Sequence, residues 1–130
     1  MIFGIGIDII EIDRISRELS KDNGFKEKIY TSLEIETGES FDNPAKYFAG
    51  CFSAKEAFFK ALGTGWRYGM TFKEIETFQE NEKTLSLRVS GKAKDFINNN
   101  LIKKTCITLA ITDKFAAALV VLELEDTEDR

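Results

Sequence analysis

The sequence contains no histidine and only two cysteines, Cys51 and Cys106, which lie far apart and form no CxxC pair. Without histidine the chain has no Cys/His zinc site and no catalytic triad that uses histidine as its base. We expect both thiols to be reduced and buried, since free cysteine is among the most buried residue types.

Long hydrophobic runs are also missing. The apolar segment of residues 1–10 is too short to cross a bilayer, and it has neither a basic start nor a cleavage site. The net charge of -4 argues against generic nucleic-acid binding, because contacts to phosphates dominate that affinity. We therefore expect a soluble, cytoplasmic protein that binds neither membranes nor nucleic acid.

The 130 residues, 43% of them hydrophobic, suit one domain with one core. We assign residues 1–124 to this domain and expect the acidic tail, residues 125–130, to be disordered. The longest predicted helix runs from Pro44 to about Leu62, since proline suits a first helical turn and Gly63 suits a stop.

Periodicity predicts further helices at residues 11–19, 25–38 (one or two short helices) and 92–99. Thr31 or Ser32 can cap a helix that has Glu34 behind it. Strands are predicted at residues 2–10, 71–78, 84–89, 105–112 and 115–124. This mixture of helices and antiparallel hairpins is an α+β pattern.

A carboxylate, Asp8, stands inside the apolar first strand. Burying a carboxylate is costly unless it is paired or binds a cation. Asp8 is therefore either the N-cap of the next helix or a metal ligand, and this segment alone favours the cap. Gly4 and Gly6 do not form a dinucleotide-binding fingerprint, because the third glycine is missing.

Two further charges, Glu56 and Lys60, stand four residues apart on one face of the long helix. They form either a surface ion pair of a few tenths of a kcal/mol, or a site in which the carboxylate binds a hard cation and the lysine binds a phosphate. The glycines that follow, Gly63 and Gly65, either cap the helix or let backbone approach a ligand closely.

Together, these two segments resemble the 4'-phosphopantetheinyl transferase family, in particular its small holo-[acyl-carrier-protein] synthase type. The family's first strand carries G-x-D with R-[IL] shortly after, which appear here at residues 6–8 and 14–15. Its long helix carries F-x-x-K-E-A-x-x-K-A-x-G-[TI]-G, which residues 52–65 match without a gap. The resemblance implies an α+β fold in which an antiparallel sheet of about five strands wraps around a long central helix.

It also implies an activity: Mg²⁺-dependent transfer of 4'-phosphopantetheine from coenzyme A to a serine of an apo acyl carrier protein, which yields holo-carrier and 3',5'-ADP. Asp8 and Glu56 match the Mg²⁺ ligands, and Lys60 matches the lysine that contacts the coenzyme A phosphates. These three are the expected catalytic residues. The full set of expected coenzyme A contacts is Lys55, Lys60, Gly63, Thr64 and Gly65.

The resemblance implies partners as well. Arg14 matches a basic position that meets the acidic carrier protein, and Arg17 and Lys21 extend the same basic side. Small members of the family are homotrimers with active sites between subunits. Whether the carrier belongs to fatty-acid synthesis or to a secondary pathway stays open.

Two positions depart from the family pattern. Many small members have a histidine at the end of the penultimate strand, where this chain has Ala-Ile-Thr-Asp-Lys at residues 110–114. Asp113 either substitutes for that histidine or is only a turn residue, in which case a metal-bound water takes the serine proton. Cys51 stands where relatives often have arginine, so a phosphate contact is lost or moved to Lys46, Arg67 or Lys114. The alternative function is a catalytically impaired homologue that only binds coenzyme A or a carrier.

Overall fold

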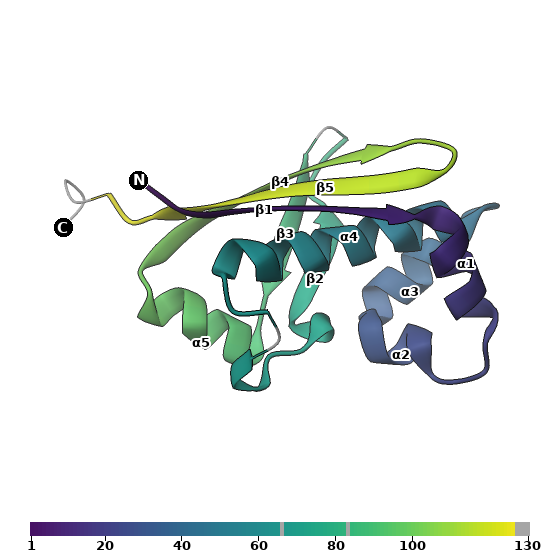
Figure 1. Cartoon of the computed structure of the whole chain (residues 1–130), viewed down its shortest axis with the longest axis horizontal. Coiled ribbons are helices and arrows are strands. Elements are labelled where there is room, and N and C mark those ends of the chain that lie inside the picture. Colours follow the sequence, from purple (N-terminus) through teal and green to yellow (C-terminus); the bar gives the residue numbers. More distant parts are fainter. Residues whose placement is uncertain (66, 83, 127–130) are drawn as a thin grey trace.

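The computed structural model describes residues 1–65, 67–82 and 84–126. Its strands and shorter helices lie around one long central helix (Figure 1). In chain order they are β1 (Ile2–Glu11), α1 (Ile12–Ser20), α2 (Phe25–Ile29), α3 (Ser32–Glu39), α4 (Pro44–Leu62), η1 (Arg67–Gly69), η2 (Phe72–Glu74), β2 (Ile75–Gln79), β3 (Leu85–Val89), α5 (Gly91–Asn99), β4 (Ile102–Ile111) and β5 (Phe115–Leu124). No helix in the described part is long and apolar enough to cross a membrane.

The central helix α4 has the predicted bounds. Pro44 occupies its first turn, where a missing N–H costs nothing. Gly63 ends it in the left-handed conformation, with φ of 79°, and its N–H donates to the carbonyls of Phe59 (3.2 Å) and Lys60 (3.1 Å). This is the glycine stop that the sequence predicted.

Strands β1, β5 and β4 form one antiparallel sheet in that order, and α4 lies along its inner face (Figure 1). Alternate residues of β1 face the helix, and two of these are glycines. A Cβ at Gly4 would stand 2.0 Å from the carbonyl oxygen of Ala61, and one at Gly6 would stand 1.9 Å from that of Ala57. Strand and helix backbones are therefore in direct contact, which only glycine permits.

Strands β2 and β3 form a separate hairpin. The five expected strands are present, but the structure divides them between a three-stranded and a two-stranded sheet. Strand β2 begins at Ile75 and not at Thr71 as predicted. Thr71 instead starts a short turn, because Glu74 Oε2 accepts hydrogen bonds from the N–H (2.8 Å) and hydroxyl (3.0 Å) of Thr71.

The segment between β1 and α4 forms three short helices, as predicted. Thr31 caps α3 and forms a reciprocal capping box with Glu34. At the other end of the chain, the N–H of Glu125 donates to the carbonyl of Leu101 at 2.8 Å, so the backbone is anchored one residue beyond the assigned domain end. Residues 127–130 of the expected tail lie outside the described residues.

Candidate active site on one face of helix α4

Asp8 is not a helix cap. Strand β1 continues past it to Glu11, and α1 begins only at Ile12. Its side chain, 13% exposed, lies on the strand face that packs against α4, where its Oδ1 accepts a hydrogen bond from Lys60 Nζ at 3.0 Å. Of the two alternatives that the sequence left open for Asp8, the structure removes the cap and pairs the carboxylate with Lys60. Its role as a metal ligand stays a prediction.

Lys60 reaches across from α4 to β1. Besides Asp8, its ammonium group donates to the carbonyl of Ile7 at 3.2 Å, and its side chain is 53% exposed. The surface ion pair between Glu56 and Lys60, one of the two alternatives that the sequence left open, is not formed among the described residues. The lysine is instead shared between a carboxylate and a backbone oxygen, so a ligand can displace it without breaking the core.

Glu56 lies one helical turn before Lys60 and is half-buried. Its pKa is raised above the ordinary value, first because burial disfavours the charged form and second because the negative charge of Asp8 is close by. The positive charges of Lys60 and Arg14 act in the opposite direction. Two neighbouring carboxylates that repel each other form a donor set that a divalent cation would stabilise.

The turn after α4 leaves open space beside this cluster. Gly63 and Gly65 both have positive φ, 79° and 62°, and nothing lies within 4 Å of the place where a Cβ would stand on either. Thr64 donates its hydroxyl hydrogen bond to the carbonyl of Gly65 at 3.0 Å. The expected group of Gly63, Thr64 and Gly65 is therefore accessible to a ligand that approaches Lys60.

Lys55 does not belong to this face, which corrects the expectation that it contacts coenzyme A. Its side chain is completely buried, and its Nζ binds Glu34 Oε1 at 2.7 Å. It also donates to the carbonyls of Phe72 (3.1 Å) and Ile75. All of its hydrogen-bonding capacity is used inside the protein, so none remains for a phosphate.

Glu34 is the functional candidate that the sequence analysis missed. The spacing of Thr31 and Glu34 predicted a helix cap, and the cap is present. The same carboxylate, however, is fully buried and also binds Lys55. A glutamate at the start of a short helix gives no sequence signal for a partner 21 residues away.

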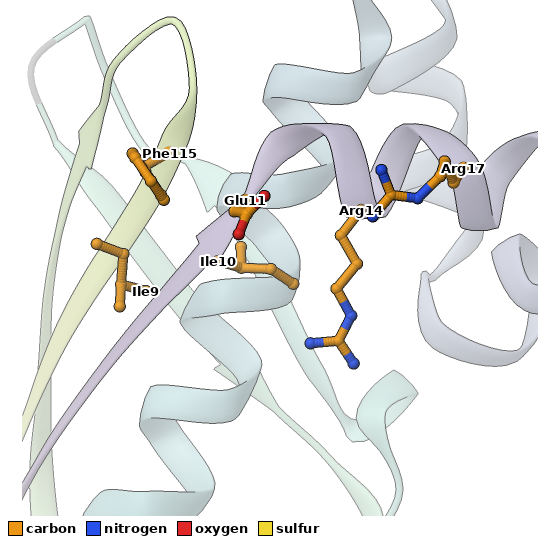
Figure 2. Close-up of a pocket in the computed structure, with 6 residues that line it drawn as sticks. All are labelled: Ile9, Ile10, Glu11, Arg14, Arg17 and Phe115. Atoms are coloured by element: carbon orange, nitrogen blue, oxygen red, sulfur yellow. The ribbon is translucent and has the colours of Figure 1, made fainter.

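The basic side of α1 is exposed and adjoins the cluster. Arg14 and Arg17 line a shallow pocket of about 300 Å³ together with Ile9, Ile10, Glu11 and Phe115 (Figure 2). Lys21 is held by Glu18 at 2.9 Å, whereas neither arginine forms an ion pair with a carboxylate of the described residues. Of the three expected carrier contacts, Arg14 and Arg17 therefore carry the available charge.

Comparison with known proteins identifies the family. Residues 4–120 match the model of the 4'-phosphopantetheinyl transferase superfamily. Holo-[acyl-carrier-protein] synthase from Maridesulfovibrio salexigens is 44% identical over 124 residues, which cover 95% of this chain and 99% of the relative. The same enzyme from Geobacter metallireducens is 39% identical over 95% of this chain and 98% of its own length.

This chain belongs to the 4'-phosphopantetheinyl transferase superfamily. Solved structures of this superfamily share its fold. The holo-(acyl-carrier-protein) synthase from Bacillus anthracis, solved in complex with CoA (3',5'-ADP), has a TM-score of 0.80 and 33% identity, covering 96% of this chain and 99% of that one. The synthase from Neisseria meningitidis has a TM-score of 0.87 and 29% identity, covering 95% and 99%.

The two departures from the superfamily's pattern occupy different environments. Asp113 lies in the tight turn between β4 and β5, with its side chain 97% exposed and bound to Lys46 at 3.1 Å. Asp8 pairs with Ala118, five residues along the strand, so Asp113 lies roughly 16 Å away and does not join Asp8 within one chain.

Cys51 is buried and contacts Thr77, with 3.0 Å between Sγ and Oγ1. Burial raises the pKa of its thiol to about 12, so it stays neutral and cannot replace a phosphate-binding arginine. Cys106, by contrast, is only half-buried, which corrects the expectation of two buried thiols. Lys46 is engaged by Asp113, and the side chain of Arg67 lies outside the described residues.

Proposed function

We propose that this chain transfers 4'-phosphopantetheine from coenzyme A to the serine hydroxyl of an apo acyl carrier protein, which yields holo-carrier and 3',5'-ADP. The observation that carries the proposal is the meeting of Asp8, Glu56 and Lys60 on one face of α4, beside an open glycine turn. Relatives named holo-[acyl-carrier-protein] synthase match nearly the whole chain, and one structural relative was solved with CoA (3',5'-ADP).

The donor set fits Mg²⁺. This ion usually takes one or two carboxylates and completes its octahedron with substrate phosphates and water, and Asp8 and Glu56 supply two carboxylates from facing elements. When bound there, Mg²⁺ would neutralise charge on the diphosphate of coenzyme A and on the oxygen that leaves with 3',5'-ADP. The pKa of Glu56 is raised first by burial and second by the charge of Asp8, and a bound cation would offset the second of these causes.

Lys60 supplies a second positive charge. Its half-exposed side chain can turn from Asp8 to a phosphate oxygen, which it binds as a compact point charge. In the reaction a bond forms between the carrier's serine oxygen and the phosphorus of phosphopantetheine, while the bond from that phosphorus to the 3',5'-ADP oxygen breaks. The serine proton passes to a carboxylate of the site or to water, since the chain has no histidine.

We propose that the carrier docks against α1. Arg14 and Arg17 lie on an exposed side of this helix next to apolar Ile9 and Phe115, and Arg14 is close enough to act on the charge of Glu56. Acidic carrier proteins would be steered to such a patch. Raising the salt concentration should increase the KM for the carrier and leave the KM for coenzyme A less affected; a salt-independent carrier KM would contradict this docking mode.

We propose a homotrimer with active sites between subunits. Its support is an apolar strip on the outer face of the three-stranded sheet, where Ile5, Ile7 and Ile9 are each more than half exposed and Leu119 lies on the paired strand. Strips of this kind mark association surfaces. Light scattering after size-exclusion chromatography measures the assembly, and a monomeric mass would refute the proposal.

The decisive experiment incubates the purified chain with coenzyme A, Mg²⁺ and apo carrier proteins and then measures the carrier's mass. We expect a gain of one phosphopantetheine, which disappears when the carrier's serine is replaced by alanine. Absence of the gain with every carrier tested would refute the transferase. If coenzyme A still bound under those conditions, the impaired, binding-only homologue would be the correct alternative.

A further inference from the structure

The carboxylate of Glu34 is a buried junction between several elements. Its side chain is completely buried, and each of its oxygens accepts two hydrogen bonds. Oε1 accepts from the N–H of Thr31 at 3.0 Å and from Lys55 Nζ at 2.7 Å. Oε2 accepts from the N–H and the hydroxyl of Thr77, at 3.0 and 2.9 Å. One side chain thus links α3, α4 and β2.

Lys55 completes the junction from the side of α4. Its ammonium group also donates to the carbonyls of Phe72, the first residue of η2, and Ile75, the first residue of β2, and lies 5.9 Å from the ring centre of Tyr30. One turn earlier on the same helix face, Cys51 contacts Thr77. Cys51 and Lys55, one turn apart on α4, are therefore held by the same buried network. No buried side-chain nitrogen or oxygen in the described part lacks a partner.

This network holds α4 from behind the candidate active site. Successive residues of a helix are rotated by about 100°, which places Lys60 roughly 140° around the axis from Lys55. Glu56 directly follows Lys55 in the chain. Any rotation or slide of α4 relative to its supports would therefore move Glu56 and Lys60 relative to Asp8, which belongs to a different element, β1.

A buried ion pair is a poor source of stability, because desolvation of the two charges offsets most of their attraction. Apolar residues of similar volume could fill the same space. Apolar side chains could not supply directional bonds, whereas Glu34 and Lys55 together make hydrogen bonds to defined atoms of the α3 N-cap, of η2 and of β2. The network is better suited to fixing one orientation of α4 than to adding stability.

We propose that Glu34 is a positioning residue for phosphopantetheine transfer: through Lys55 and Thr77 it fixes the rotation of α4 and thereby the separation of Glu56 and Lys60 from Asp8. This inference rests on the proposed function of the site. It assigns Glu34 no contact with substrate, and it gives Lys55 a supporting role behind the site.

The test uses the full chain with the double substitution Glu34→Gln/Lys55→Met. Glutamine keeps an acceptor for Thr77, and methionine keeps volume while removing the buried charge, so the variant should fold. We expect kcat to fall about 10- to 100-fold, the range typical of residues that orient metal ligands. Isothermal titration should show weaker Mg²⁺ binding by about the same factor, while the KM for the carrier changes less than threefold.

A matched control separates positioning from stability. Ile97→Ala removes a buried apolar side chain of α5, a helix that supplies no residue to the hydrogen-bonded network or to the site, and it should lower stability by about 2–5 kcal/mol. At a temperature where both variants are fully folded, the control should keep the wild-type kcat and Mg²⁺ affinity. Equal kcat and Mg²⁺ affinity in the double variant and the wild type would overturn the proposal.

A second variant covers the case in which the double variant fails to fold. Glu34→Asp keeps the charge but withdraws the carboxylate by one methylene, so we expect a folded protein with intermediate kcat and Mg²⁺ affinity. A folded Glu34→Asp variant with wild-type values would also overturn the proposal. If the wild type showed no transfer, the proposed function would fail, whereas the Mg²⁺ titrations would still decide whether Glu34 positions the carboxylates.

Discussion

On one side of helix α4, Lys55 is completely buried and neutralised by an equally buried Glu34 at 2.7 Å. On the other side, Lys60 is 53% exposed, and its Nζ binds Asp8 Oδ1 at 3.0 Å. The two lysines are only five residues apart, and both belong to the family motif at residues 52–65. Their surroundings differ because the first faces three packed segments, whereas the second faces the edge where β1 meets open space.

The difference teaches which charges can act on a ligand. The buried pair of Glu34 and Lys55, on the rear face of α4, has all of its hydrogen-bonding groups in use. Neither residue can change partners without leaving an unpaired charge in the interior. The front cluster of Asp8, Glu56 and Lys60 holds two carboxylates and one half-exposed cation, and it leaves Glu56 with a raised pKa and no ion pair among the described residues. Charged groups that can change partners, such as Asp8, Glu56 and Lys60, are suited to binding substrates and ions. Charged groups whose hydrogen bonds are all made inside the protein, such as Glu34 and Lys55, are suited to fixing the orientation of α4.

The largest expected effect comes from the front face. Glu56→Gln removes a proposed Mg²⁺ ligand while keeping the shape of the side chain, so transfer should fall by about 10³-fold or more. The measurement is carrier modification under saturating coenzyme A, followed by mass spectrometry. Circular dichroism should show an unchanged fold, and full activity in the variant would contradict the metal-binding role of Glu56.

The rear face should show the largest effect on stability. Lys55→Met leaves the buried carboxylate of Glu34 without its cation and should lower the free energy of unfolding by about 3–5 kcal/mol. The matched variant Lys60→Met removes an exposed partner and should cost less than about 1 kcal/mol. Urea denaturation measures both. Similar losses in the two variants would erase the distinction between saturated and exchangeable charges.

Contact between β1 and α4 connects the two faces, and Gly6 tests it. A Cβ there would stand 1.9 Å from the carbonyl oxygen of Ala57, so Gly6→Ala must push the helix from the strand and should cost about 1–3 kcal/mol or more. Because Asp8 follows on the same strand, activity should fall as well.

Gly50→Ala provides the control for Gly6→Ala. Gly50 lies inside α4, and the nearest atom to its added Cβ would be the flexible tip of Ile111 at 3.1 Å. Its gain in helix propensity, about 1 kcal/mol, should offset the contact and leave activity unchanged. Denaturation midpoints and transfer rates of both variants test the pair, and equal behaviour would argue against strand–helix contact as the determinant of site geometry.

Much of this architecture could be predicted from sequence because it depends on local signals. Pro44 and Gly63 delimit α4, and the strand predicted at residues 115–124 has the observed bounds of β5. The family motif also predicted the front cluster, since Asp8, Glu56 and Lys60 lie in segments with specific spacing.

What could not be predicted depends on distant contacts. Lys55 stands beside Glu56 in the motif, and only the packing of α3 and β2 shows that it faces the opposite way. Thr71 is a residue type that favours strands, yet its hydrogen bond to Glu74 forms a turn, and β2 begins only after that turn at Ile75. The cap role of Asp8 was reasonable locally and failed because pairing with β5 carries β1 past it to Glu11.

The smallest expected effect is the pH dependence of stability at the front face. The pKa of Glu56 is raised in the folded state, so ionising it costs more there than in the unfolded chain. At a pH below its ordinary value of 4.5 the group is protonated in both states, and no cost arises. As the pH rises through the raised folded-state pKa, the cost appears and the folded state loses stability. Glu56→Gln removes that cost, so its Tm should exceed the wild-type value by about 1–3 °C near pH 7, with the group's partial exposure limiting the gain.

That Tm difference should vanish as the pH falls toward 4.5. The Tm difference should also shrink when Mg²⁺ is added at neutral pH. The wild type keeps the carboxylate of Glu56 as a ligand, so binding of the ion stabilises it more than it stabilises the variant. Differential scanning fluorimetry across this range measures both effects, with Glu36→Gln, which removes an exposed carboxylate on α3, as the control. A Tm difference that persisted unchanged at low pH would show that Glu56→Gln changes stability through packing. The charge of Glu56 would then not be what distinguishes the face of Asp8, Glu56 and Lys60 from the buried pair of Glu34 and Lys55.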